Sequence, residues 1–223
     1  MELKDEIKSI AIRAKILGNK VEILDENTIL LEDRHNLGYV VYYSKNGEVK
    51  HKEFSQCIIK RIHNTKYLYV SNIRNKYTSV IDYNTNILID ETTDYINHIY
   101  GDFFKIDVTS QLIKVVNCKT KQKTYPEYID MLAYKFNTKC TFVMIKRLAI
   151  DIYNNELELI YRYNIGTEAI HKLVTVYEEY IQIADSYGRC ILISHKGKEI
   201  SRLNTIDEIK IENKGLNKAI RIY

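Results

Sequence analysis

Short polar turns recur along this chain at nearly even spacing, each flanked by segments in which apolar and polar residues alternate. The turns begin at Ser44, Tyr83, Cys118, Tyr153 and His195, so successive starts are 39, 35, 35 and 42 residues apart. A mean period of about 38 residues lies within the range of propeller and solenoid repeats. Asn, Gly and Lys suit hairpin turns, which often need a positive φ. The sequence therefore predicts a repeated unit built from hairpins.

Each period divides into four short segments. In the second unit these are YLYVSN (67–72), TSVIDY (78–83), ILIDE (87–91) and YINHIYG (95–101). Short segments with a period near 2 predict strands, because a helical solenoid would show apolar spacing of 3.6 over longer elements. Four antiparallel strands per unit are typical of a β-propeller blade, whereas a β-sandwich needs no such period. We expect an all-β propeller built from small four-stranded blades.

The other four units follow the same scheme, and the third is the least regular of them. Their predicted strands are 28–33, 39–44, 48–54 and 58–63 in the first, 102–108, 112–117, 123–126 and 128–136 in the third, 140–146, 148–153, 157–163 and 169–177 in the fourth, and 180–185, 189–194, 199–203 and 207–213 in the fifth. Together the five repeats occupy residues 27–213.

Two stretches resemble known propeller repeats. The second unit resembles the YVTN type at Tyr69-Val70-Ser71-Asn72, Ser79-Val80-Ile81-Asp82 and Thr85-Asn86. The fifth unit is similar to the NHL type at Ala184-Asp185-Ser186, Arg189, Ile191 and the turn residue Gly197. The chain departs from these patterns in its scarce glycine and in the missing Asp-Ser pair of the third and fourth units. The resemblance implies blade structure and says little about activity, because propellers host enzymes, lectins and scaffolds.

The two ends of the chain are left over after the five units. An open ring leaves unpaired strand edges, so we expect 219–223 to pair with a strand from 9–25, giving six blades with a composite closing blade. In this scheme 1–223 is a single propeller domain, with closing strands in 1–26 and a closing strand in 214–223. Residues 2–17 also carry apolar residues at helical spacing, and a helix there would leave five blades.

Composition indicates an ordinary soluble domain of 223 residues, 45% hydrophobic and 28% charged. No 18-residue apolar run predicts a transmembrane helix, and the N-terminus lacks the apolar core of a secretory signal, so we expect a cytoplasmic protein without a membrane partner. Cys57, Cys118, Cys140 and Cys190 are scattered and form no CxxC pair. We predict buried free thiols, since a metal site would need several of them to meet in space.

No catalytic motif is present: the chain has no HExxH, no GxSxG and no glycine-rich phosphate loop. We therefore expect no enzyme activity and no cofactor. Histidines occur in different units and are expected to be structural or superficial; they are His35, His51, His63, His98, His171 and His195. Asp82, Asp151 and Asp185 occupy similar strand positions and could form a ring of carboxylates, or bond backbone amides in turns.

Two features bear on binding partners. The net charge is +4, and Lys119, Lys121 and Lys123 lie in one turn, KTKQK. Lysines beside tyrosines could bind single-stranded nucleic acid. A solvated loop is the more ordinary explanation, since charged residues are usual in turns. The NHL resemblance implies RNA binding as one option. The 19 tyrosines suit a protein interface, because tyrosine offers stiff contact area with a polar tip.

We therefore expect a non-catalytic interaction module that binds a protein partner through one face of a propeller ring. The alternatives are RNA or single-stranded nucleic-acid binding through a basic face, and carbohydrate binding. The sequence leaves the oligomeric state open.

Overall fold

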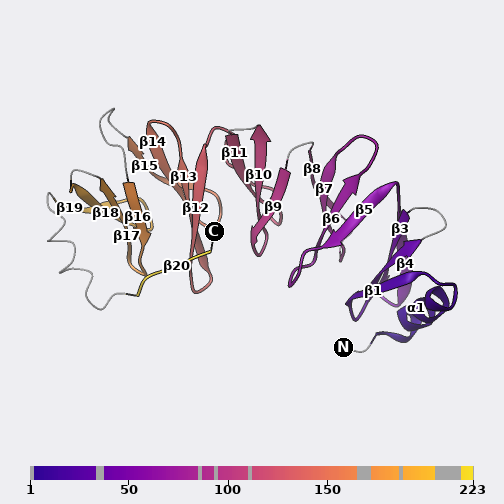
Figure 1. Cartoon of the computed structure of the whole chain (residues 1–223). Helices are drawn as coiled ribbons and strands as arrows, with labels where there is room; N and C mark the ends of the chain where they lie inside the picture. The colour runs from indigo at the N-terminus through magenta and orange to yellow at the C-terminus, as the bar shows by residue number, and fades with distance from the viewer. Residues whose placement is uncertain are drawn as a thin grey trace. The chain divides into compact units, whose positions relative to one another are not determined.

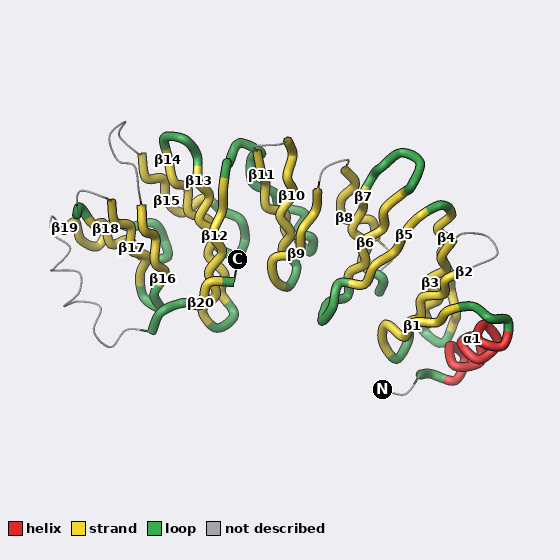
Figure 2. The backbone as a smooth tube through the Cα atoms, in the orientation of Figure 1, coloured by secondary structure: helices red, strands yellow, loops and turns green. Residues whose placement is uncertain are grey.

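The computed structural model describes residues 3–33, 38–84, 87–92, 95–109, 112–164, 172–185, 188–203 and 217–222. Over these ranges the chain forms one helix and small antiparallel sheets, as Figures 1 and 2 show. The all-β class is thus confirmed, with one helix added. The chain divides into two compact units, residues 1–95 (unit 1) and 96–223 (unit 2), and each is described by itself.

Unit 1 contains the helix and two four-stranded sheets, in which consecutive strands are neighbours. Sheet I consists of β1 (Lys20–Asp25), β2 (Thr28–Asp33), β3 (Gly38–Lys45) and β4 (Glu48–Ser55). Sheet II consists of β5 (Cys57–Arg61), β6 (Tyr67–Asn72), β7 (Thr78–Asp82) and β8 (Ile87–Thr92). Meanders of this kind need only short connections, which the turns of the sequence supply.

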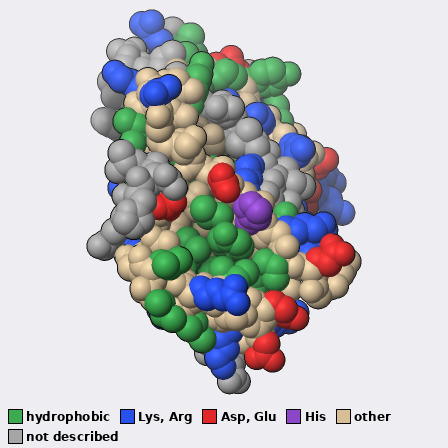
Figure 3. Space-filling model, turned by 90° about the vertical axis from the view of Figure 1, so that its right-hand side faces the viewer, with side chains coloured by type: hydrophobic (Ala, Val, Ile, Leu, Met, Phe, Trp, Pro, Cys, Tyr) green, Lys and Arg blue, Asp and Glu red, His purple; other side chains and the backbone are tan. Residues whose placement is uncertain are grey.

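The helix α1 (Asp5–Ile16) covers one face of sheet I. Ile7, Ala11 and Ala14 share one side of the helix at helical spacing and are buried against Ile29 and Leu31. On its outer side the helix leaves further hydrophobic side chains exposed, namely Ile12, Ile16 and Leu17. Figure 3 looks onto this side of the molecule and shows hydrophobic side chains lying among charged ones. The helical alternative is thus confirmed over Asp5–Ile16.

Sheets I and II pack face to face around one apolar cluster. Leu30 and Val41 of sheet I meet Leu68 and Val70 of sheet II, and all four are buried. Arg61 of β5 ties the sheets together: its guanidinium donates hydrogen bonds to the carbonyl oxygens of Ile23 and Leu24, at 3.2 and 2.8 Å. The two sheets of unit 1 are therefore held together by the burial of apolar side chains and by the hydrogen bonds of Arg61.

Unit 2 holds the remaining strands; β9 begins at the unit boundary. Sheet III consists of β9 (Tyr95–Tyr100), β10 (Phe103–Thr109) and β11 (Leu112–Asn117); sheet IV of β12 (Asp130–Phe136), β13 (Lys139–Ile145), β14 (Ala149–Tyr153), β15 (Leu159–Asn164) and β20 (Ile220–Arg221); and sheet V of β16 (Lys172–Val176), β17 (Tyr180–Asp185), β18 (Cys190–Ser194) and β19 (Glu199–Leu203). Phe103 packs on Phe142 between sheets III and IV, with ring centroids 4.7 Å apart. Ile152 and Ile181 pack between sheets IV and V.

The repeat period predicted from the turns is the sheet period. In sheets I, II, IV and V the predicted turn joins the third strand to the fourth, as at β3–β4 and β18–β19. The grouping of strands into units is wrong by one strand, because the segment at 58–63 contains β5, which begins sheet II. Sheets I and II are separated by Gln56 alone, at φ +55°, which is as short as a hairpin turn. Turn spacing therefore predicts the period but not its starting point.

The third unit departs from four strands. The predicted strand at 123–126 is absent, and residues 123–128 run beside β11 through two isolated bridges, Val116 with Lys123 and Ile113 with Tyr128. The predicted strand at 207–213 and the motif residues Thr85, Asn86 and Ser186 lie outside the described residues.

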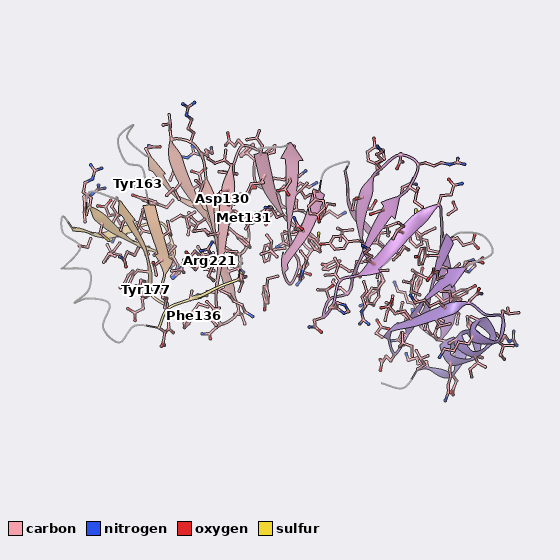
Figure 4. The ribbon with its side chains drawn as sticks, viewed as in Figure 1. Asp130, Met131, Phe136, Tyr163, Tyr177 and Arg221 are labelled. Atoms are coloured by element: carbon pink, nitrogen blue, oxygen red, sulfur yellow. The ribbon has the colours of Figure 1, made fainter. Side chains whose placement is uncertain are left out.

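The predicted closure of the chain is wrong. The C-terminal strand β20 pairs with β12 of sheet IV, where Arg221 faces Tyr134 and Ile220 faces Lys135. Figure 4 shows Arg221 beside the strand that carries Met131 and Phe136. The amide of Ala219 donates to the carbonyl of Val176, so the C-terminal segment joins sheets IV and V. Residues 9–25 are occupied instead by α1 and by β1, whose partner is β2. The number of blades stays a prediction.

Cys57, Cys118, Cys140 and Cys190 are buried and free, which confirms the prediction made for the thiols. Within the part of the chain that the structure describes, no helix is long and apolar enough to span a membrane.

Candidate binding groove

Three cavities of unit 1 share the side chain of Tyr39. The largest has a volume of about 730 Å³, and its neighbours measure about 190 and 60 Å³. We call the largest one the Tyr39 groove. The described residues that line it are Glu32, Asp33, Gly38, Tyr39, Gln56, Cys57, Ile73 and Arg74. They come from the end of β2, the start of β3, the β4–β5 connection and the turn after β6, so both sheets build the groove.

The alternating direction of the strands brings these residues to one end of the two sheets. Successive antiparallel strands reverse direction, so the end of β2, the start of β3, the β4–β5 connection and the β6–β7 turn lie at the same end. Gln56 leads directly from one sheet to the next, and its carbonyl accepts a hydrogen bond of 2.9 Å from the amide of Ile73. This bond connects two of the segments that line the groove.

Tyr39 is half-buried against the apolar cluster between sheets I and II. Burial raises the pKa of its hydroxyl, the negative charge of Glu32 raises it further, and a hydrogen bond with the backbone of Ile59 acts in the opposite direction. The phenol is therefore neutral at physiological pH and can offer a hydrogen bond. Its ring supplies an aromatic surface within the groove.

The groove carries negative charges on one segment and a positive charge on another. Glu32 and Asp33 end β2, and Arg74 lies in the turn after β6. Glu32 makes a loose ion pair with Lys20, with 3.7 Å between Oε2 and Nζ. Asp33 has an interaction of its own within the protein. The groove therefore presents a carboxylate side and a guanidinium side to a bound molecule.

The turn that carries Ile73 and Arg74 is held in shape by its own side chains. Asn72 Oδ1 accepts hydrogen bonds from the amides of Arg74 and Asn75, at 2.9 and 3.3 Å. Ile73 remains 61% exposed although it is large and apolar. Ile73 therefore offers apolar surface at the wall of the groove.

Cys57 lines the groove with a thiol whose surroundings disfavour ionisation. Its Sγ lies 3.3 Å from the carbonyl oxygen of Ser55, to which it donates, and burial raises its pKa. A raised pKa disfavours the thiolate, which is the nucleophilic form.

The three aspartates singled out from the sequence have different environments. Asp82 is buried, pairs with Lys66 at 2.8 Å and accepts a hydrogen bond of 3.0 Å from the amide of Asn84. It therefore makes the turn contact that the structural alternative predicts. The side chain of Asp185 lies outside the described residues.

Asp151 is the centre of a buried polar network in unit 2, described here as the Asp151 network. Its side chain is fully buried and receives two hydrogen bonds from Arg162, at 2.6 and 2.8 Å, and one from the hydroxyl of Tyr128 at 2.7 Å. Lys146 Nζ lies 3.4 Å away, and the hydroxyl of Tyr153 is 2.6 Å from that of Tyr128.

The charge of Asp151 is compensated on several sides. Burial alone would raise the pKa of Asp151, but the hydrogen bonds from Arg162 and Tyr128 and the charge of Lys146 hold it below its usual value. Burial raises the pKa of Tyr128, and its bonds to Tyr153 and Asp151 add to this. The network is satisfied within the protein, which is the behaviour of a structural site that joins the 118–129 connection to sheet IV.

The lysines of the KTKQK turn are exposed. Lys119 and Lys121 follow Asn117, whose Oδ1 accepts from the amide of Lys119 at 3.0 Å and whose carbonyl accepts from the amide of Lys121 at 2.8 Å. The backbone of Lys123 bridges to Val116, and Lys123 has a further interaction within the protein. None of the three is among the described residues that line the Tyr39 groove.

Replacing Lys119, Lys121 and Lys123 by Gln together tests the nucleic-acid alternative. We expect the melting temperature to change little, because exposed charges contribute little to folding. We also expect no measurable binding of single-stranded RNA or DNA at physiological salt before or after the change. Submicromolar binding by the unmodified protein would contradict this, provided that the substitutions lower the slope of log affinity against log salt by about one unit per lysine.

The described histidines fit structural or surface roles. His98 and His195 each lie within hydrogen-bond distance of a backbone carbonyl oxygen, 3.0 Å from Gly101 and 2.8 Å from Tyr177. His35 and His171 lie outside the described residues. Within the part of the chain that the structure describes, no group of three or more His, Cys, Asp or Glu side chains could hold a metal ion.

The comparisons with known proteins show distant likenesses only. No family model and no curated protein matches the chain. Among solved structures the chain is similar to KlHsv2 with loop 6CD replaced by a Gly-Ser linker (9% identity, TM-score 0.33, 82% of this chain and 66% of that one), to Kluyveromyces lactis Hsv2p (9%, 0.28, 78% and 73%) and to dihydro-heme d1 dehydrogenase NirN in complex with DHE (13%, 0.36, 80% and 45%). The chain thus spans less than two thirds of the first and the last of these. At such values the likeness carries no argument about what this chain binds.

Proposed function

We propose that the chain is a non-catalytic binding module, and that the Tyr39 groove receives a segment of a protein partner. The observation that supports this is a preformed cavity of about 730 Å³ built by two sheets. Binding pockets of about 300–1,000 Å³ are typical, with mostly apolar walls and few polar groups. Here Tyr39, Cys57 and Ile73 supply apolar surface, and three charged side chains with Gln56 supply the polar groups.

An extended segment fits the groove better than a compact ligand. The cavity of about 190 Å³ shares Asp33, Gly38 and Tyr39 with the groove, so the two adjoin at the start of β3. Tyrosine and arginine are the residues that contribute most often to protein interfaces. Tyr39 and Arg74 both line the groove, and Ile73 adds an exposed apolar contact beside them.

The wider arrangement is part of the same proposal. We propose that the four-stranded meanders are blades of a propeller-type array related to YVTN and NHL repeats, and that the protein works in the cytoplasm. The order of strands in sheets I, II and V supports the first, since each sheet runs through four consecutive strands. The four free, buried cysteines support the second, because reducing compartments keep thiols free.

The substitution Ile73→Glu tests the proposed function. It places a charge on the fixed turn beside the groove, and we expect it to remove the protein partners that the wild-type protein captures from extracts of its native host. Because Ile73 is exposed, the melting temperature should stay within a few degrees of wild type. Mass spectrometry of the captured proteins, in quantitative comparison with wild type, gives the result.

Ile58→Glu is the matched control. Ile58 is also an exposed isoleucine of unit 1, at 47%, and it does not line the groove. Partners retained by Ile58→Glu and lost by Ile73→Glu would support the groove as the binding site. Equal retention by both variants would show that partners bind elsewhere, and nucleic acid recovered in place of protein would favour the alternative function.

A further inference from the structure

We propose that the Tyr39 groove selects an arginine side chain of the partner segment, seating its guanidinium between the ring of Tyr39 and the carboxylate of Glu32. This inference rests on the proposed function and adds the chemistry of the bound residue. The juxtaposition that carries it is an aromatic ring and a carboxylate on the same face of sheet I, at the wall of a cavity.

The β-ladder places the two side chains together. Glu32 of β2 and Tyr39 of β3 are directly opposite each other in the register, so their side chains point to the same face. Directly opposed residues in antiparallel strands have Cβ atoms about 4.5–5.5 Å apart. Both residues line the groove of about 730 Å³ and the smaller cavity of about 60 Å³. The negative charge of Glu32 also raises the pKa of Tyr39, as expected for close neighbours.

The protein already places a cation of its own near this carboxylate. Lys20 of β1 faces Glu32 in the register, and its Nζ lies 3.7 Å from Oε2. The side chain of Lys20 is 68% exposed, so this ion pair is solvated and contributes little to stability. A partner's cation that also gains contact with Tyr39 could displace it at small cost. Lys20 therefore shows that the position accepts a positive charge and leaves it replaceable.

Arginine suits the position better than lysine. A guanidinium stacks on an aromatic ring through its flat face and bonds a carboxylate through its edge, whereas an ammonium is a more strongly hydrated point charge. Asp33 adds a second negative charge at the same end of β2. Arg74, in the turn after β6, disfavours a second cation and suits an acidic residue or a carbonyl group of the segment. The charge pattern thus matches one arginine at the β2 end of the groove.

The test uses short peptides and the whole chain. Acetyl-Gly-Arg-Gly-amide is titrated against the isotope-labelled protein, and the amide resonances of Gly38, Tyr39 and Cys57 are followed. Citrulline replaces arginine in a parallel titration, since it has nearly the same shape without the charge. We expect saturable shifts with the arginine peptide at concentrations up to about 10 mM, and affinity at least about tenfold weaker with citrulline.

Two variants sharpen the result. Glu32→Gln should weaken the affinity for the arginine peptide at least about fivefold, because the substitution removes the carboxylate and keeps the shape of the side chain. Lys20→Gln should strengthen the affinity for this peptide about twofold or more, because the substitution removes the competing cation. A merely structural role of either residue would not produce opposite effects. Glu48→Gln, an exposed acid of β4 that does not line the groove, should leave the affinity unchanged.

Three results would overturn the inference: no saturable shift at about 10 mM, equal affinity for the citrulline peptide, or equal affinity with Glu32→Gln. They would leave the proposed function standing if Ile73→Glu still removes protein partners while Ile58→Glu keeps them. The two proposals therefore fail through separate measurements.

Discussion

Gly197→Ala is expected to lower the free energy of unfolding of unit 2 by more than about 3 kcal/mol. Gly197 forms the β18–β19 turn at φ +79°, and a Cβ built there would lie 1.8 Å from the carbonyl oxygen of Ile160 and 2.9 Å from its carbonyl carbon. Both are backbone atoms of β15, so no side-chain rotation relieves the clash. The turn has to move away from sheet IV, which disrupts packing between sheets IV and V.

Gly47→Ala is the control for Gly197→Ala. Gly47 has the same φ of +79° in the β3–β4 turn, and nothing lies within 4 Å of its Cβ position. Its substitution should cost only the conformational penalty, about 1–2 kcal/mol. Urea denaturation followed by tyrosine fluorescence, with hydrogen exchange of β15 and β18, compares the two variants. Equal losses would show that the close approach to Ile160 does not matter for stability.

Asp151→Asn is expected to lower the free energy of unfolding of unit 2 by about 2–4 kcal/mol at neutral pH. The substitution removes the charge that Arg162 and Lys146 compensate and one acceptor of the Tyr128 hydroxyl. The loss stays below that of a fully buried ion pair, because the side chain of Arg162 is 46% exposed and can be solvated again. Asp130→Asn, an exposed acid of β12, should change stability by little.

The effect of Asp151→Asn depends on pH with a definite sign. The pKa of Asp151 is lowered in the folded protein, so the carboxylate stabilises the fold above its unfolded pKa of about 3.9. This contribution is lost as the pH falls through the lower folded value. The gap between wild type and Asp151→Asn should therefore be full at pH 7 and shrink progressively below about pH 4. A gap that grows on acidification would contradict the assignment of Asp151 as a charged group.

The sequence allowed the strands to be predicted better than their grouping. Short segments rich in Tyr, Ile, Leu and Val, such as 67–72 and 112–117, form strands with the predicted bounds. The predicted grouping of strands is wrong at Gln56. This residue alone connects β4 of sheet I to β5 of sheet II, and so short a connection looks like a hairpin turn in the sequence. The prediction for the closing strand is wrong because Ala219 is buried beside Val176. This contact is long-range, and no local sequence pattern indicates it.

The groove could not be predicted for a related reason. Glu32, Tyr39 and Ile73 are ordinary strand and turn residues, and only the pairing of β2 with β3 and the packing of sheet II beside them bring these together. Asp151 was singled out by its strand position, but its partners Tyr128 and Arg162 were not. A register prediction for β14–β15, which places Asp151 opposite Arg162, would have found that pair.

The position of α1 has a consequence for how such a protein could lengthen during evolution. Stacked sheets present at each end a surface on which one more copy of the unit could be added by duplication. Here that surface of sheet I is buried under Ile7, Ala11 and Ala14. A duplicated unit inserted before β1 would have to displace the helix and bury its own residues in the same place. While α1 is in place, this face of sheet I is therefore closed to a further copy of the unit.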